Sequence, residues 1–309
     1  MIRKSFLGFL LCFSSVFQSF GQELKLFKIH DFDLNGNVKK CTVITNYGKE
    51  VFEFNEEGYL TKSITAYNDT DQDVTTYTYK NGFLAEKRLE SYKSNVLDQE
   101  SSMANFYIID STKQKIIKEQ IISYDKAFFE EQEYLFEKED RLSRITTSHE
   151  NAVDETRIEY NSYKNETTKT YFLNDIIEKS IRNSINKLKS GEQNRIVLTK
   201  EYLDGKPNKA IEQRYNNDEK LIYEELFLNT GSEDNFTSQE THLYEYDKEG
   251  IIVKEIIKQG DKTSEKEFIF QFDGNEPKNW VKKIIAPENT YTTRKIEYYP
   301  KLELIENPK

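Results

Sequence analysis

The stretch Tyr244-Glu245-Tyr246-Asp247-Lys248-Glu249-Gly250-Ile251-Ile252 holds two aromatic residues two positions apart, then a polar turn with a glycine, then aliphatic residues. Successive side chains of a strand point to opposite faces, so Tyr244 and Tyr246 share one face and Glu245 lies on the other. Asp247 to Gly250 suits a type I turn closed by a residue with positive φ, which glycine adopts without steric cost. The stretch therefore predicts a β-hairpin.

The same pattern recurs along the chain and indicates a repeat protein. Residues 52–60 and 77–84 are further clear copies. The second aromatic residues of the copies are Phe54, Tyr79, Phe136, Tyr160, Tyr215, Tyr246 and Phe272. They lie about 26 or about twice 26 residues apart, and a fixed period of roughly 20 to 50 residues marks an array of supersecondary units. With eroded copies near Tyr107 and Lys187, we infer about nine units of about 26 residues.

The composition favours an all-β protein, because the chain has 20 Tyr and 20 Phe but only 5 Pro. We expect an array of antiparallel β-hairpins that forms a long twisted meander sheet with little helix. The pattern does not distinguish an open sheet from a closed barrel. Residues 175–189 have two interpretations: Ile177, Ile181 and Ile185 recur at a helical spacing before Gly191, and a polar strand pair fits equally well.

The first residues have the features of a secretory signal peptide. A basic start, Met1-Ile2-Arg3-Lys4, precedes an apolar run over residues 6–17 and a small-x-small cleavage site at Ser19-Phe20-Gly21. This run is shorter than the roughly 20 residues that span a bilayer, and no later segment reaches that length. We expect a signal peptide over residues 1–21, no transmembrane segment, and one repeat domain over residues 22–309. The protein should be exported to the periplasm or cell surface of a Gram-negative-type bacterium.

The cysteines and the net charge argue against an internal disulfide and against a nucleic-acid partner. Cys12 lies in the predicted signal peptide, so Cys41 alone would remain and no internal disulfide could form. The net charge is −10, with Lys and Glu interleaved along the predicted strands. An acidic chain without a basic cluster argues against nucleic-acid binding. Interleaved charges suit cross-strand pairs on a solvated face.

The aromatic-x-aromatic-Asp-x-x-Gly-x-aliphatic pattern resembles the YD repeat of RHS-type proteins over most of residues 32–299. The Asp position is occupied by Asp247, Asp273, Asn55, Asn161 and Asn216. Residues 34–39 and 274–280 also look like the first and last units of small exported YD-like proteins. The resemblance implies a β-hairpin array with an envelope role, sometimes carbohydrate binding. The toxin-enclosing shell of large RHS members is not expected, because no effector domain follows the repeats.

The sequence shows few signs of catalysis or metal binding. His30, His149 and His242 are isolated, and no Gly-x-Ser-x-Gly elbow, phosphate loop or Cys-x-x-Cys pair occurs. We therefore expect no cofactor. A catalytic pair of carboxylates cannot be chosen among 54 acidic residues without geometry.

One segment imitates the start of a calcium loop. Asp69, Asp71 and Asp73 stand at the first three ligand positions. Val74 replaces the glycine that the loop needs for its sharp turn, and Lys80 replaces the closing glutamate. The other interpretation is an acidic hairpin loop.

Aromatic side chains are the candidates for a binding surface. Trp280 and the motif residues Tyr77, Tyr79, Tyr244 and Tyr246 could stack on sugar rings and form hydrogen bonds. In the other interpretation, Trp280 packs on neighbouring aromatic residues and closes the last repeat. Separately, Asp110-Ser111-Thr112 resembles a short acceptor motif of a bacterial periplasmic O-glycosylation system.

These observations favour an exported, non-enzymatic β-repeat protein that presents an extended surface to an envelope polysaccharide or protein. A competing hypothesis is a glycan-acting enzyme with two carboxylates from adjacent hairpins. A third is an accessory or assembly factor for a larger exported machine.

Overall fold

Antiparallel strands make up almost all of the structure, a computed structural model that describes residues 26–300 except 126–127, 188–190, 192 and 232–234. In the first half of the chain, the strands are β1 (Val38–Thr45), β2 (Gly48–Phe54), β3 (Leu60–Ala66), β4 (Gln72–Lys80), β5 (Phe83–Lys93), β6 (Val96–Asp110), β7 (Ile116–Ser123), β8 (Phe128–Phe136), β9 (Leu142–Ser148) and β10 (Val153–Tyr163). In the second half, they are β11 (Glu166–Leu173), β12 (Ile176–Lys187), β13 (Gln193–Leu203), β14 (Lys206–Tyr215), β15 (Leu221–Asn229), β16 (Phe236–Tyr246), β17 (Ile252–Gln259), β18 (Lys262–Phe272), β19 (Trp280–Ala286) and β20 (Thr290–Tyr298). Two short 3-10 helices, η1 (Ile29–Phe32) and η2 (Lys138–Asp140), complete the described elements.

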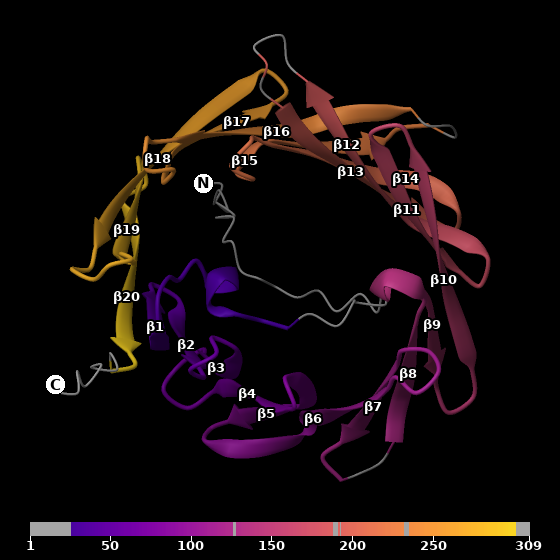
Figure 1. Cartoon of the computed structure of the whole chain (residues 1–309). Helices are drawn as coiled ribbons and strands as arrows, with labels where there is room; N and C mark the ends of the chain where they lie inside the picture. The colour runs from indigo at the N-terminus through magenta and orange to yellow at the C-terminus, as the bar shows by residue number, and fades with distance from the viewer. Residues whose placement is uncertain (1–25, 126–127, 188–190, 192, 232–234, 301–309) are drawn as a thin grey trace, which may run out of the picture.

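The strands close into a 20-stranded barrel. Each strand pairs with the next along the chain, and β20 pairs with β1. Figure 1 shows the result as a wide ring. The prediction of an all-β antiparallel fold with little helix is confirmed, but the long twisted meander is rolled up rather than open. Adjacent strands rotate in one sense, and closure removes the two edges that an open sheet would expose.

The helical interpretation of residues 175–189 is wrong, because β12 occupies Ile176–Lys187. A spacing of four residues is an even number, so it repeats on one face of a strand as well as on one face of a helix. Opposite β12, the polar strand β13 pairs from Gln193 onward. Within the described residues, no helix is long and apolar enough to cross a membrane.

The repeat motif marks the turns that lead from an even-numbered strand to the next odd-numbered one. The strand register shifts just before the second aromatic residue at Phe54, Tyr79, Phe136, Tyr215, Tyr246 and Phe272. Such a bulge inserts one residue and strengthens the local twist.

The polar residue after the bulge holds the turn together. The side-chain oxygen of Asn55 accepts from the N–H of Tyr59 at 2.8 Å, and that of Asp247 accepts from the N–H of Ile251 at 2.9 Å. Gly250 has φ of +77°, a conformation that L side chains rarely adopt. The motif therefore encodes a capped turn.

Some motif tyrosines also join a unit to the one before it. The hydroxyl of Tyr79 donates to the carbonyl oxygen of Leu60 at 2.7 Å, and that of Tyr246 donates to the carbonyl oxygen of Leu221 at 2.7 Å. Leu60 and Leu221 each begin the strand after the preceding motif turn. The aromatic and aliphatic positions of the motif are thus linked between consecutive hairpins.

The motif aromatic residues line the inner wall of the barrel. In Figure 1, η1 lies inside the ring beside the first strands. Phe32 packs against Phe52 and Phe54, and Phe27 packs against Tyr77, so these motif side chains point inward. The buried residues of this cluster are Leu34, Val38, Cys41, Phe54 and Leu60. Burial raises the pKa of the Cys41 thiol to about 11.

A second buried cluster lies further round the inner wall and consists of Ile117, Tyr134, Leu142, Ile145, Ile158 and Tyr171. The outer wall is different, because ion pairs cross it between neighbouring strands. Examples are Lys40–Glu53 at 3.2 Å, Lys118–Glu133 at 3.0 Å and Lys254–Glu265 at 2.6 Å. The outer wall is therefore charged, as the interleaved Lys and Glu predict.

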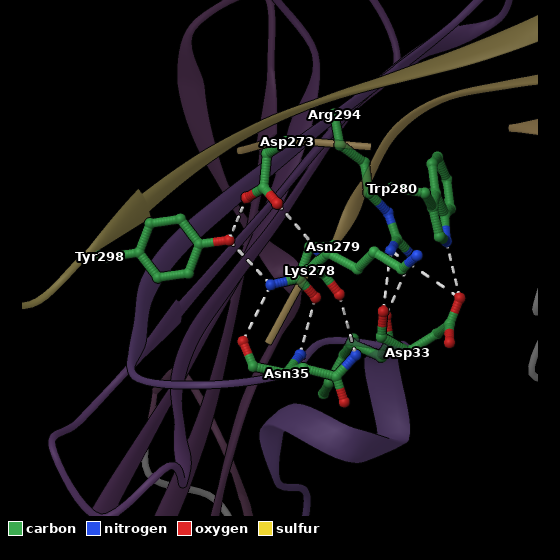
Figure 2. Close-up of polar contacts among 9 residues, drawn as sticks. Asp33, Asn35, Asp273, Lys278, Asn279, Trp280, Arg294 and Tyr298 are labelled. Carbon is green, nitrogen blue, oxygen red and sulfur yellow. Dashed lines mark hydrogen bonds and ion pairs between the residues drawn. The ribbon is translucent and has the colours of Figure 1, made fainter. Parts of the chain in front are cut away.

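The seam between β20 and β1 is locked by a polar network, shown in Figure 2. The side-chain oxygen of Asn279 accepts from the N–H of Asn35 at 2.7 Å, and its amide nitrogen donates to the carbonyl of Asn35 at 2.8 Å. The indole of Trp280 donates to the carboxylate of Asp33 at 2.6 Å. Arg294 donates to the carbonyls of Phe32 and Asp33, and its guanidinium lies 3.5 Å from the Trp280 ring centroid. The predicted first and last units therefore meet here.

Candidate functional site

Three exposed tyrosines lie along one end of the barrel, on turns that lead from an odd-numbered strand to the next even-numbered one. Tyr47 is on the β1–β2 turn, Tyr67 follows β3, and Tyr124 follows β7. Their exposed fractions are 68%, 56% and 42%. We call this end, defined by these three residues, the tyrosine rim. Motif turns occupy the opposite end, because consecutive antiparallel strands turn at alternate ends.

Close contact of neighbouring turns holds Tyr47 and Tyr67 near each other. A Cβ on Gly48 would lie only 2.6 Å from the carbonyl oxygen of Ala66, so no other residue fits there without movement. Thr45 stabilises the β1–β2 turn, because its hydroxyl oxygen accepts from the N–H of Tyr47 at 3.2 Å. The tight packing brings the Tyr47 turn against the backbone at Tyr67.

Hydrogen bonds fix the Tyr67 side chain. Its hydroxyl donates to one carboxylate oxygen of Asp73 at 2.8 Å, and the Ser91 hydroxyl donates to the other at 2.7 Å. Burial, with the adjacent Asp73 carboxylate, raises the pKa of Tyr67 to about 12. The phenol is therefore a neutral donor, and the residue remains more than half exposed.

Asp71 ties the β3–β4 turn to the β5–β6 turn. Its carboxylate accepts from the side-chain amide of Asn68 at 2.9 Å and from the N–H of Ser94 at 2.7 Å. These bonds, with a third from the hydroxyl of Thr70, lower the pKa of Asp71. The N–H of Asn95 donates to the carbonyl of Thr70 at 2.8 Å, so the two turns form one continuous surface.

The predicted calcium ligands lie in this same turn region. Asp69 is exposed, whereas Asp71 and Asp73 bind donors of the protein itself. Across the described ranges, no group of three or more His, Cys, Asp or Glu side chains is arranged to hold a metal ion. We assign no cation to the turn, and we interpret its carboxylates as supports for the rim.

The aromatic residues proposed from the sequence lie elsewhere. Trp280 is 8% exposed and belongs to the seam. Tyr77 is covered by Phe27, and the hydroxyls of Tyr79 and Tyr246 bind backbone carbonyls. Tyr244 lies on the inner wall beside His242. The aromatic residues that were proposed from their place in the repeat therefore face the inside of the barrel or the seam.

The rim tyrosines were missed because they stand outside the repeat. One signal was present in the sequence: Tyr47 and Tyr67 occur within polar turn sequences, Asn46-Tyr47-Gly48 and Tyr67-Asn68-Asp69. An aromatic residue in a turn has no strand face on which to be buried, and such exposed apolar groups mark binding sites when several lie together.

The inner wall carries a charged cluster around His242. Its Nδ1 lies 2.7 Å from the carboxylate of Glu255, and its Nε2 lies 2.6 Å from that of Glu240. The ammonium of Lys266 also contacts Glu255, at 3.2 Å. Both ring nitrogens face acceptors, an arrangement that favours the imidazolium. His242 therefore acts as a positive link between two strands.

This cluster predicts a pH dependence of stability. The hydrogen bond to Glu255, with a second to Glu240, raises the pKa of His242 despite partial burial. A group whose pKa is raised in the folded state stabilises the fold. This contribution is fully present below about pH 6.5 and is lost as the pH rises through the pKa of the folded state. In urea unfolding, the free energy of unfolding of the wild type should decline above about pH 6.5. In H242Q, this dependence on pH should be much weaker.

Glu255 determines how the stability contributed by this cluster changes at acidic pH. Although burial opposes ionisation, the hydrogen bonds from His242 and Lys266 lower the pKa of Glu255. The contribution of Glu255 to the free energy of unfolding is therefore present above about pH 4.3 and is lost as the pH falls. H30Q is the control, because the His30 side chain is largely exposed. An unchanged profile in H242Q would contradict the assignment.

A shallow cleft of about 440 Å³ lies at the opposite end of the barrel, between the turns at residues 216–220 and 247–250. The ammonium of Lys220 lies across it and donates to the carbonyl of Gly250 at 2.6 Å. The Lys220 side chain thus braces the two motif turns that line the cleft.

Comparisons with known proteins show only distant likenesses. No family model and no curated protein matches the chain. Among solved structures, a porin-like protein from Bacteroides vulgatus ATCC 8482 is 8% identical, with 86% of this chain and 100% of that chain covered and a TM-score of 0.25. A porin-like protein from Bacteroides uniformis ATCC 8492 is 10% identical, with coverages of 84% and 96% and a TM-score of 0.23.

A third match is to a chain of the Photorhabdus luminescens Tc holotoxin pore. The identity is 9%, the coverage is 81% of this chain and 19% of that chain, and the TM-score is 0.19. These TM-scores are low, so we draw nothing about function from the three structures. The comparisons identify no YD-repeat family, and that resemblance stays a prediction.

Proposed function

We propose that this protein is an exported, non-enzymatic binding protein of a Gram-negative-type envelope, and that its tyrosine rim binds an envelope polysaccharide. The observation that carries the proposal is a set of three exposed tyrosines at one end of a closed barrel, two of which, Tyr47 and Tyr67, are on neighbouring turns. Tyrosine rings can pack on the apolar faces of sugars, and phenol, carboxylate and amide groups can pair with sugar hydroxyls.

The rigidity of the rim supports this proposal. Tyr67 is anchored by Asp73, and Asp71 joins two turns through backbone and side-chain donors. A surface that is already ordered loses little conformational entropy on binding. The predicted signal peptide, which lies outside the described residues, supplies the argument for export.

The charged outer wall supports an aqueous location in the periplasm or at the cell surface. Lysine or arginine on a lipid-facing barrel wall costs about 2–4 kcal/mol each at the bilayer midplane. Ion pairs such as Lys118–Glu133 and Arg144–Glu155 stand on the outer wall here. Water around the barrel is the environment in which such pairs are favourable.

A binding titration tests the function directly. Mature protein from Gln22 onward is titrated with purified envelope polysaccharide fractions by calorimetry, alongside the Y47A/Y67A double variant. If each ring contributes about 0.5–1.5 kcal/mol, the double variant should bind about 5- to 150-fold more weakly. Y163A is the matched control, because Tyr163 is equally exposed at the other end of the barrel.

The outcomes separate the hypotheses. If Y163A loses as much polysaccharide affinity as Y47A/Y67A, the tyrosine rim is not the binding site. If no polysaccharide binds and the wild type captures one stoichiometric envelope protein, the accessory-factor hypothesis replaces it. Thermal unfolding of each variant confirms that lost binding is not lost folding.

A further inference from the structure

The β6–β7 turn presents a serine at the motif end of the barrel. β6 ends at Asp110, which pairs with Ile116 at the start of β7, so residues 111–115 lie outside the strand ladder. Ser111 and Thr112 are exposed. A modifying enzyme could reach this backbone without breaking any strand pairing.

Asp110 shapes the turn around the serine. One of its carboxylate oxygens accepts from the N–H of Thr112 at 2.9 Å and from the hydroxyl of Thr112 at 2.8 Å. These two bonds lower the pKa of Asp110, which keeps the carboxylate ionised. Asp110 and Thr112 are thus tied to each other across Ser111, whose side chain is left to project from the turn.

The Ser111 hydroxyl differs from its neighbour in availability. Within the described residues, Ser111 Oγ has no hydrogen-bond partner, whereas the Thr112 hydroxyl donates to Asp110. Thr70, another turn hydroxyl, is likewise engaged, by Asn68 and Asp71. An unengaged hydroxyl on an exposed turn is the better nucleophile, because no internal hydrogen bond has to break before it reacts.

We propose that Ser111 is an O-glycosylation site. Its Oγ attacks the anomeric carbon of a glycosyl diphosphate donor, a C–O glycosidic bond forms, and the bond from the anomeric carbon to the diphosphate oxygen breaks. The diphosphate leaves with the electron pair, and the serine proton passes to a base of the transferase. The fixed carboxylate of Asp110 and the Thr112 side chain are the flanking features that a transferase could read.

The position of Ser111 is compatible with the proposed binding function. It lies at the motif end, away from Tyr47, Tyr67 and Tyr124. A glycan there would leave the tyrosine rim open. This inference rests on the export that the proposed function includes, but it does not depend on which ligand the rim binds.

Mass spectrometry tests the site. Wild type, S111A and S94A are each expressed in the producing organism and purified from its envelope, and intact masses and peptides covering residues 111 and 94 are measured. Ser94 is a matched control, because it is also an exposed turn serine but lacks the Asp-Ser-Thr arrangement. We expect a glycan mass on wild type and S94A, and its complete loss in S111A.

The same spectra distinguish failure of the site from failure of export. Mature protein without a glycan, or a glycan that persists in S111A, overturns the proposal while export stands. Protein that retains residues 1–21 and has no glycan overturns both. The tyrosine-rim titration is read independently on unmodified protein.

Discussion

Replacing Trp280 with alanine should lower the free energy of unfolding by about 3–5 kcal/mol, the range for removing a buried large aromatic side chain. Three contacts would go at once. The ring is buried against Phe270, its N–H donates to Asp33, and the Arg294 guanidinium stacks on it. Urea unfolding of wild type and W280A, followed by tyrosine fluorescence and far-UV circular dichroism, measures the loss.

The location of the damage is as informative as its size. Hydrogen exchange in W280A should accelerate first at the β1–β20 pairing, because Trp280 holds the segment before β1 against the end of the chain. Y291A is the control: Tyr291 is half-exposed on the adjacent strand, and its loss should change stability by about 0.5 kcal/mol or less. A uniform acceleration over all strands would contradict a seam-specific role.

The second large effect is expected at Glu119, a buried carboxylate on the inner wall. It accepts from the side-chain amide of Asn105 at 2.6 Å and from the hydroxyls of Tyr107 at 2.7 Å and Tyr134 at 2.9 Å. Burial and this carboxylate raise the pKa of both tyrosines, which keeps them protonated as donors. E119L should lower the free energy of unfolding by about 3–5 kcal/mol, because buried donors would lose their acceptor.

A conservative variant separates hydrogen bonding from packing at this site. E119Q keeps one carbonyl acceptor at nearly the same volume and should lose less than half as much stability as E119L. Tyr134 also retains its bond to Gln132 in both variants. Equal losses in E119Q and E119L, measured by urea unfolding, would show that the negative charge rather than the acceptor geometry is what matters.

The local rules of this fold could be read from the sequence, because they act over a few residues. Asn55 and Asp247 cap their turns, and the alternation of Tyr244 and Tyr246 selects one face. Closure could not be read in this way. It depends on contacts such as Asn35 with Asn279, which are 244 positions apart and show no local pattern.

The candidate site was predicted less well than the fold. Sequence reasoning selected aromatic residues by their place in the repeat, and the repeat positions serve inward packing and the bonds between hairpins. Tyr47, Tyr67 and Tyr124 stand at turns where the repeat imposes no residue type. The proximity of Tyr47 to Tyr67 depends on strand register and on the close approach at Gly48, which no local sequence pattern encodes.

The pairing of β20 with β1 sets the order in which strand edges find partners as the chain is synthesised from its N-terminus. β1 is made early and can pair with β2 at once, yet its other edge has no partner until the last strand has been made. During that interval it is a template for stray pairing with other chains. Lys39 and Lys40 on β1 are charged residues of the kind that protect a bare edge. A chain that stops before β20 would therefore leave this edge of β1 exposed.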